Sequence, residues 1–143
     1  MAINFFEEGV SSGIRHRNKT KQWLKSIAEQ KGYKIKNLNY VFCSDEYLYD
    51  LNVQFLNHDT YTDIITFDQS ESKDAIEGDI YISTERVKEN ALKLDTEFQT
   101  ELLRVIIHGL LHLCGFRDKT KTESLGMRNE EDKALDIYKE INP

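Results

Sequence analysis

Two histidines at helical spacing are the residues of this chain best suited to carry chemistry. His108 and His112 stand four residues apart in the segment HGLLHLCGFRD, which places both imidazoles on one helix face, about 5–6 Å apart at Cβ. Gly115 lets the chain leave that helix with a positive φ and fold back, and Asp118 then brings a carboxylate to the same point. Two imidazoles and one carboxylate are the ligand set of a catalytic zinc, with a fourth position for water. We therefore predict one zinc ion held by His108, His112 and Asp118.

The residue after the first histidine limits the chemistry of such a site. In HExxH peptidases it is a glutamate that acts as the general base, whereas here it is Gly109. Water must therefore be activated by the metal alone, by another carboxylate or by the substrate. Asp63 and Asp79 each precede a predicted strand, and either is a candidate base or a partner of a ligand histidine, although such residues more often cap turns. Asp63 and His108 are our candidate catalytic residues.

The surrounding pattern predicts the elements that hold these residues. Thr96 and Gln99 have the spacing of a capping box, and the apolar stretch 105–114 after them indicates an enclosed central helix. A second capping box, Thr120 with Glu123, opens a last helix to about residue 141. Further helices are expected at 20–31, 45–56 and around 87–94, and strands at 3–7, 38–43, 64–67 and 79–83. We predict one α+β domain over residues 1–143, with a small, mostly parallel sheet of about four strands covered by helices.

Composition agrees with a globular domain and limits its partners. Of the 143 residues 39% are hydrophobic and 31% charged, with a formal net charge of −6, so any nucleic-acid site must be a local basic patch. Cys43 and Cys114 lie in apolar runs without metal-type spacing, which is typical of reduced thiols in the cytosol. The longest apolar run, 105–116, is too short to span a bilayer. We therefore expect a cytoplasmic protein with no membrane partner.

Three segments and the tail that follows them together resemble the YbeY endoribonucleases, the bacterial rRNA-maturation factors. Segment 108–118 resembles that family's HGxLHLxGYDH signature. Segment 51–68, LNVQFLNHDTYTDIITFD with Asp59 and Asp63, resembles its LNxxYRxxDxPTDVLSF block, and segment 77–83, EGDIYIS, resembles its LGDIxIS strand. The matches stand in the right order along the chain, and a tail rich in Glu and Met follows them, as in the family.

The resemblance implies a fold like the catalytic core of a zincin metalloprotease, one bound zinc ion, and cleavage of single-stranded RNA. It also implies a role in small-subunit (16S) rRNA maturation and ribosome quality control. The expected partners are then single-stranded rRNA and the small ribosomal subunit or its assembly factors. His108 and His112 carry over as ligands, whereas the family's third histidine is Asp118 here, and aspartate oxygen is a competent zinc ligand.

Leu56 is a second departure from the family, because the family motif has an arginine at this place. Leucine cannot bind phosphate, so another cation is needed. One candidate is Arg117, which lies beside Asp118 in the sequence. We include Arg117 among the candidate catalytic residues. The other is the basic segment from Arg15 to Lys21, which can track an RNA backbone or be an ordinary solvated turn.

Two other functions stay open at this point. A metallopeptidase on a zincin-like frame is disfavoured by Gly109. A non-catalytic ribosome-assembly factor with a structural metal is kept open by Leu56. Loss of the fold on removal of the metal, without any cleavage to lose, would identify the second of these.

Overall fold

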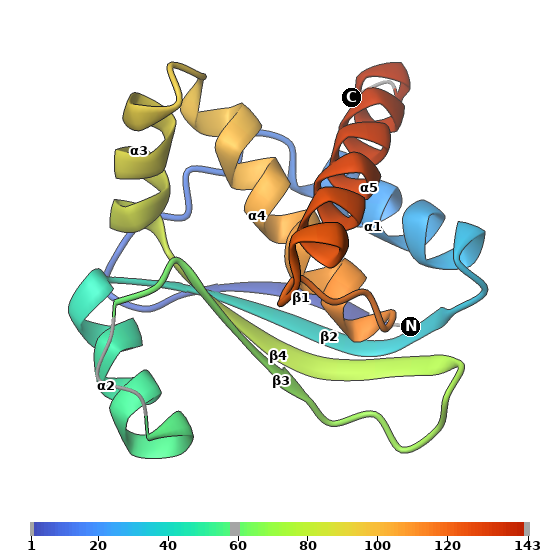
Figure 1. Cartoon of the computed structure of the whole chain (residues 1–143), viewed down its shortest axis with the longest axis horizontal. Coiled ribbons are helices and arrows are strands. Elements are labelled where there is room, and N and C mark those ends of the chain that lie inside the picture. The colour runs from blue at the N-terminus through green and yellow to red at the C-terminus, as the bar shows by residue number, and fades with distance from the viewer. Residues whose placement is uncertain (1, 58–60, 142–143) are drawn as a thin grey trace.

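A four-stranded sheet forms the centre of the computed structural model, which describes residues 2–57 and 61–141 (Figure 1). The strand order is β1-β2-β4-β3. Strands β1 (Ala2–Glu7), β2 (Lys34–Cys43) and β4 (Ala75–Ser83) are parallel, and β3 (Ile64–Asp68) pairs antiparallel with β4 at the edge. The predicted small, mostly parallel sheet is thus confirmed. Asp59, which belongs to the second family motif, lies outside the described residues.

Helices cover the two faces of this sheet unequally (Figure 1). On one face lie α1 (Arg17–Gln30), α3 (Thr84–Lys93), α4 (Phe98–Leu113) and α5 (Lys121–Glu140), and on the other lies α2 (Asp45–Leu56). The larger apolar core lies under the four helices, and a smaller cluster of Cys43, Leu48 and Ile65 lies under α2. No helix in the two described ranges is both long and apolar enough to cross a membrane.

Helix α4 is the enclosed central helix that the sequence predicts. Its side chains Leu102, Ile106 and Leu110 are fully buried. The Tyr40 hydroxyl of β2 donates a hydrogen bond to the Ile106 carbonyl at 2.8 Å, which ties the helix to the sheet. These contacts give α4 a fixed position against the sheet, so side chains at its end are held in defined places.

The two ends of the segment between α4 and α5 form as the sequence predicts. Gly115 has a φ of 94°, and its N–H donates to the carbonyl of His112 at 3.0 Å, which is the left-handed helix end that favours glycine. At the start of α5, Thr120 and Glu123 make both hydrogen bonds of the capping box. The predicted turn back after the histidine pair is therefore present.

The capping box predicted at the start of α4 is wrong. Glu97, not Thr96, is the N-cap residue, and its side chain makes no capping hydrogen bond. Gln99 donates instead to the carbonyl of Gly13, in the loop between β1 and α1. A tertiary hydrogen bond has here replaced the local one.

Several elements begin earlier than the sequence pattern predicts, among them β2 at Lys34 instead of residue 38 and α3 at Thr84 instead of about 87. Strand β4 starts at residue 75 instead of 79, because Ile76 pairs with Ile35 of β2 and both are buried. Helix α1 starts at Arg17 instead of residue 20. Part of the basic segment is therefore the first turn of a helix, where Arg17 forms an ion pair with Glu7 at 3.5 Å.

Candidate metal centre

The predicted ligands meet at the end of α4. His108 and His112 lie on one face of the helix, and the turn at Gly115 returns the chain so that Asp118 faces both rings. Nε2 of His108 lies 3.2 Å from one Asp118 oxygen, and Nε2 of His112 lies 3.7 Å from the other. One ligand atom from each residue lies within 4.8 Å of the others. This cluster can hold a metal ion.

A glutamate from α5 orients the first of these ligands. Oε2 of Glu131 lies 2.7 Å from Nδ1 of His108, and a carboxylate only accepts hydrogen bonds. Nδ1 therefore donates its proton to Glu131, and Nε2 is the ring nitrogen that faces Asp118 and is placed to bind a metal. A histidine that donates its second N–H to a carboxylate is the usual arrangement around a bound metal.

Arg104 in turn holds the glutamate. Its guanidinium donates to Oε1 of Glu131 at 3.0 Å and to Asp132 at 2.7 Å. The Glu131 side chain is only 6% exposed, so burying its charge requires these partners. His108, Glu131 and Arg104 form one connected chain of hydrogen bonds from the ligand cluster into α5.

Sequence reasoning missed Glu131 and Arg104. They come from two helices, and no spacing rule connects residue 131 to residue 108. One signal was available: Glu131 follows Met127 at four residues and precedes Leu135 at four on the inner face of α5, and all three are buried. A glutamate within a helix's apolar stripe needs a buried partner.

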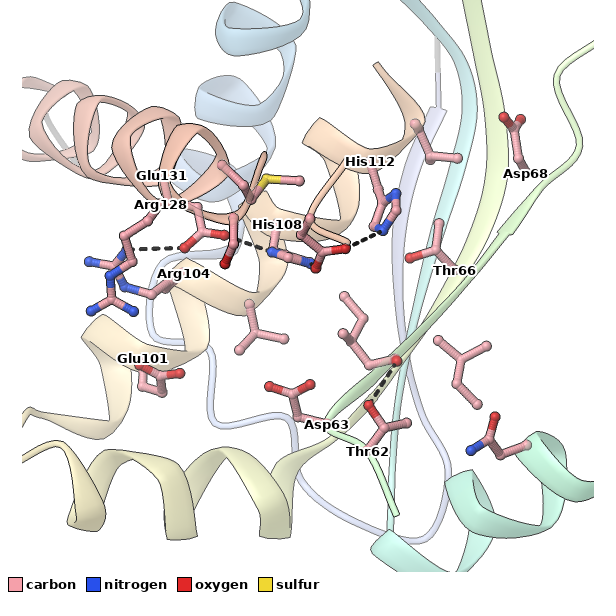
Figure 2. A pocket seen from close by; sticks show the side chains of 18 of the residues that line it. Thr62, Asp63, Thr66, Asp68, Glu101, Arg104, His108, His112, Arg128 and Glu131 are labelled. Atoms are coloured by element: carbon pink, nitrogen blue, oxygen red, sulfur yellow. Dashed lines mark hydrogen bonds and ion pairs between the residues drawn. The ribbon is translucent and has the colours of Figure 1, made fainter. Parts of the chain in front are cut away.

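A cavity of about 720 Å³ opens in front of the ligand cluster, between α4, α5 and β3 (Figure 2). Its wall includes apolar side chains such as Leu56, Ile64 and Met127 and a larger number of charged ones. The charged and imidazole side chains on the wall are Asp63, Asp68, Glu101, Arg104, His108, His112, Asp118, Arg128 and Glu131. The ligand atoms are thus open to a molecule of substrate size.

Burial and neighbouring charges set the protonation of the two rings. Burial lowers the pKa of His112, and the adjacent His108 lowers it further, so His112 is held as the neutral imidazole that binds metals. Burial also acts to lower the pKa of His108, but the hydrogen bond and charge of Glu131 outweigh it, so the pKa of His108 is raised.

Asp63 lies on the wall of the same cavity, as expected of a candidate catalytic carboxylate (Figure 2). The Asn90 amide donates to one of its oxygens at 3.3 Å. Burial raises the pKa of Asp63, and the nearby His108 opposes that rise. A carboxylate with a raised pKa can exchange protons near neutral pH more readily than an ordinary one. Its catalytic role stays a prediction.

The other predicted site residues lie away from the cavity wall. Arg117 is exposed and does not line the cavity, and neither does the basic segment from Arg15 to Lys21. Asp79 accepts hydrogen bonds from Asn39 and Gln69, on the sheet face opposite that of its buried neighbour Ile80. The structure therefore brings together the three ligands and Asp63, and not these residues.

The packing of α4 on the sheet also explains why position 109 is a glycine. An added Cβ would lie 2.8 Å from Cδ1 of Ile80 and 3.1 Å from Cδ1 of Ile64, both of which belong to the sheet. A side chain at this position would therefore require Ile80 and Ile64 to shift. The close packing of α4 on the sheet favours glycine where the peptidase motif has its glutamate.

Comparison with known proteins gives one consistent family. The family described as "Endoribonuclease YbeY" matches residues 6–139. A protein of that description from Cytophaga hutchinsonii is 52% identical, with 96% of each chain covered. Another from Porphyromonas gingivalis is 46% identical over 96% of this chain and 91% of its own. A solution structure of a protein from Thermotoga maritima superposes with a TM-score of 0.68 at 29% identity, covering 97% of this chain and 93% of that one.

Proposed function

Because the chain belongs to the YbeY endoribonuclease family, we propose that it is a hydrolase that cleaves phosphodiester bonds in single-stranded RNA. The observation that supports this best is the ligand cluster of His108, His112 and Asp118 at the base of an open cavity. A polymer can reach such a site from solvent, whereas a structural metal is normally enclosed by four protein ligands.

We propose that the ion is zinc. The donor set is two imidazole nitrogens and one carboxylate oxygen, which suits zinc and leaves one coordination position open. The hydrogen bond from His108 to Glu131 supports the same fit, since it turns the free Nε2 toward Asp118. When bound, a zinc ion supplies Lewis acidity toward water and phosphate oxygens.

The remaining residues of the cavity have separate proposed roles. Glu131 and Arg104 position His108 through their hydrogen bonds. Asp63, whose pKa is raised by burial, is the proposed acceptor for the proton of the attacking water. Arg117 is exposed beside Asp118, and we propose that it contacts the RNA strand just outside the cavity.

We further propose that the natural substrate is 16S rRNA in the small ribosomal subunit or with its assembly factors, and that the protein works in the cytoplasm as one domain. The family resemblance supports the first part of this proposal. Cys43 and Cys114 are buried free thiols, which is the state that a reducing compartment maintains.

The decisive experiment combines metal content with RNA cleavage. Wild type, His112→Ala and Asp118→Asn are purified, analysed for metal, and assayed on single- and double-stranded RNA. Asp136→Asn is the control, since this carboxylate is 77% exposed and does not line the cavity. We expect cleavage of single strands by wild type and the control only, with metal lost from His112→Ala and Asp118→Asn.

Two results would replace the proposal by one of its rivals. Wild type that holds metal and unfolds on its removal, yet cleaves no RNA, would be a structural-metal assembly factor. Cleavage of peptides but not of RNA would identify a peptidase that works without the glutamate of the peptidase motif, since this chain has Gly109 there.

A further inference from the structure

The cavity wall carries an excess of negative charge. Its carboxylates are Asp63, Asp68, Glu101, Asp118 and Glu131, and its guanidinium groups are Arg104 and Arg128. An RNA strand brings one negative charge for each phosphate, and proteins bind it by neutralising those charges with Lys and Arg. A divalent ion at the ligand cluster would offset only part of the excess, so the strand needs a further cation on this wall.

Arg104 does not meet this need. Its guanidinium is already bound by the carboxylates of Glu131 and Asp132, and its side chain is only 15% exposed. Turning it toward a phosphate would leave the buried Glu131 charge without its partner and His108 without a fixed support. Arg104 therefore acts within the protein.

Arg128 is placed differently. It stands three residues before Glu131 on α5, so both side chains reach the same wall. Arg128 is exposed, and across the described part of the chain no carboxylate lies within ion-pair distance of its guanidinium. Its electrostatic influence is on Glu101: burial raises the pKa of that carboxyl, and the charges of Arg104 and Arg128 act against the rise. The guanidinium donors of Arg128 are thus available to a ligand.

The position of Arg128 also selects which phosphate it can reach. Figure 2 shows Arg104 and Arg128 at the end of the cavity opposite His112, with Glu131 between them and His108. Glu131 contacts both His108 and Arg104, so its carboxylate separates the arginine end from the ligand cluster. A phosphate at the cluster is therefore not the one that contacts Arg128. Leu56, which stands where the family motif has an arginine, lines the same cavity but offers only an apolar surface and so cannot bind a phosphate.

We propose that Arg128 binds a phosphate of the RNA strand next to the scissile one, and so positions the strand across the metal centre. This inference rests on the proposed endoribonuclease function. A planar guanidinium with free donors suits bidentate binding of phosphate oxygens better than an ammonium group. The site would accept any base, because it reads the backbone alone.

The test measures binding of a nuclease-resistant, 2′-O-methylated single-stranded RNA oligonucleotide to the metal-loaded protein by fluorescence anisotropy. Arg128→Gln, Arg128→Lys and the matched control Lys133→Gln are compared; Lys133 lies on the same helix with a side chain 65% exposed and does not line the cavity. Arg128→Gln should weaken binding roughly 10- to 100-fold, the loss expected for one charge-assisted contact. It should also reduce the slope of log affinity against log salt by about 0.7. Arg128→Lys should restore part of the affinity, and Lys133→Gln should have little effect.

A second arm locates the phosphate. The scissile bond is mapped with wild type, and each neighbouring phosphate is replaced in turn by an uncharged methylphosphonate. For one of these RNAs the effect of Arg128→Gln should disappear, because the contact is already absent. Thermal unfolding of each variant shows whether it is folded; a change at this exposed position should leave the midpoint unchanged.

The outcomes separate this inference from the proposed function. Wild type that cleaves RNA, with Arg128→Gln binding as tightly and with the same salt slope, would overturn the role of Arg128 alone. An equal loss on every methylphosphonate RNA would overturn it as well, since the effect would then come from general charge. Wild type that neither cleaves nor binds RNA would overturn both.

Discussion

Replacing Glu131 tests the support of the metal centre most directly. Glu131→Ala removes the carboxylate that accepts from Nδ1 of His108 at 2.7 Å and from Arg104 at 3.0 Å. The His108 ring then loses the contact that sets its tautomer and orientation, while its own position on α4 is unchanged. We expect the apparent affinity for zinc to fall.

The size of this effect follows from the two hydrogen bonds. Loss of such an outer partner of a ligand histidine weakens metal binding about 10- to 100-fold, which is about 1.4–2.7 kcal/mol. The free energy of unfolding should fall as well, by about 2–3 kcal/mol, because Arg104 keeps Asp132 but loses its buried partner. Glu131→Gln keeps an acceptor oxygen without the charge, so its metal affinity should lie between wild type and Glu131→Ala.

Zinc affinity is measured by competition with a chromophoric chelator, and stability by urea unfolding of the metal-free protein. Asp132→Ala is the matched control. Asp132, with a side chain 55% exposed, is the other partner of Arg104, and its removal leaves the His108–Glu131 hydrogen bond intact. A folded Glu131→Ala protein with zinc affinity within about two-fold of wild type would refute the reasoning. So would an equal loss of affinity in Asp132→Ala.

Three further changes test the frame around the site. Gly109→Glu should destabilise the protein by more than about 3 kcal/mol in urea unfolding, because its Cβ alone would lie 2.8 Å from Ile80; a midpoint near that of wild type would contradict this. Tyr40→Phe should cost about 1–2 kcal/mol, since the hydroxyl of this fully buried residue donates to a carbonyl of α4, and an unchanged unfolding free energy would show that the bond is dispensable. The hydrogen bond and charge of Lys31 lower the pKa of Glu130 below its ordinary value of 4.5. The ion pair therefore stabilises the fold above about pH 4.5, and this contribution to the free energy of unfolding is lost as the pH falls through the lowered pKa. Glu130→Gln should therefore be about 1 kcal/mol less stable than wild type at pH 7 and nearly equal to it at pH 2, and a difference that persists at pH 2 would show another cause.

Local patterns were sufficient for much of the fold. The enclosed helix α4 follows from its apolar run, and the start of α5 follows from Thr120 and Glu123, whose capping box involves only neighbours along the chain. Where a distant group competed, the local pattern misled: Gln99 bonds to Gly13 instead of capping α4. Strand β4 extends beyond its apolar pattern because pairing with β2 satisfies its backbone.

The candidate site likewise has a part set by local sequence and a part set by tertiary packing. His108, His112, Gly115 and Asp118 lie within eleven residues, so helix geometry and one left-handed turn are enough to bring the three ligands together. This much the sequence by itself determined, including the family to which the motif points.

Only the tertiary structure decided what surrounds those ligands. Glu131 reaches His108 because α5 packs across α4. Asp63 reaches the cavity from just before the start of β3, and Arg128 lines the cavity whereas Arg117 does not. These contacts join segments far apart in the chain, and their geometry depends on how whole elements pack. The periodicity of a helix predicts which face a residue occupies. Which element packs against that face depends on the burial of apolar surface over the entire domain.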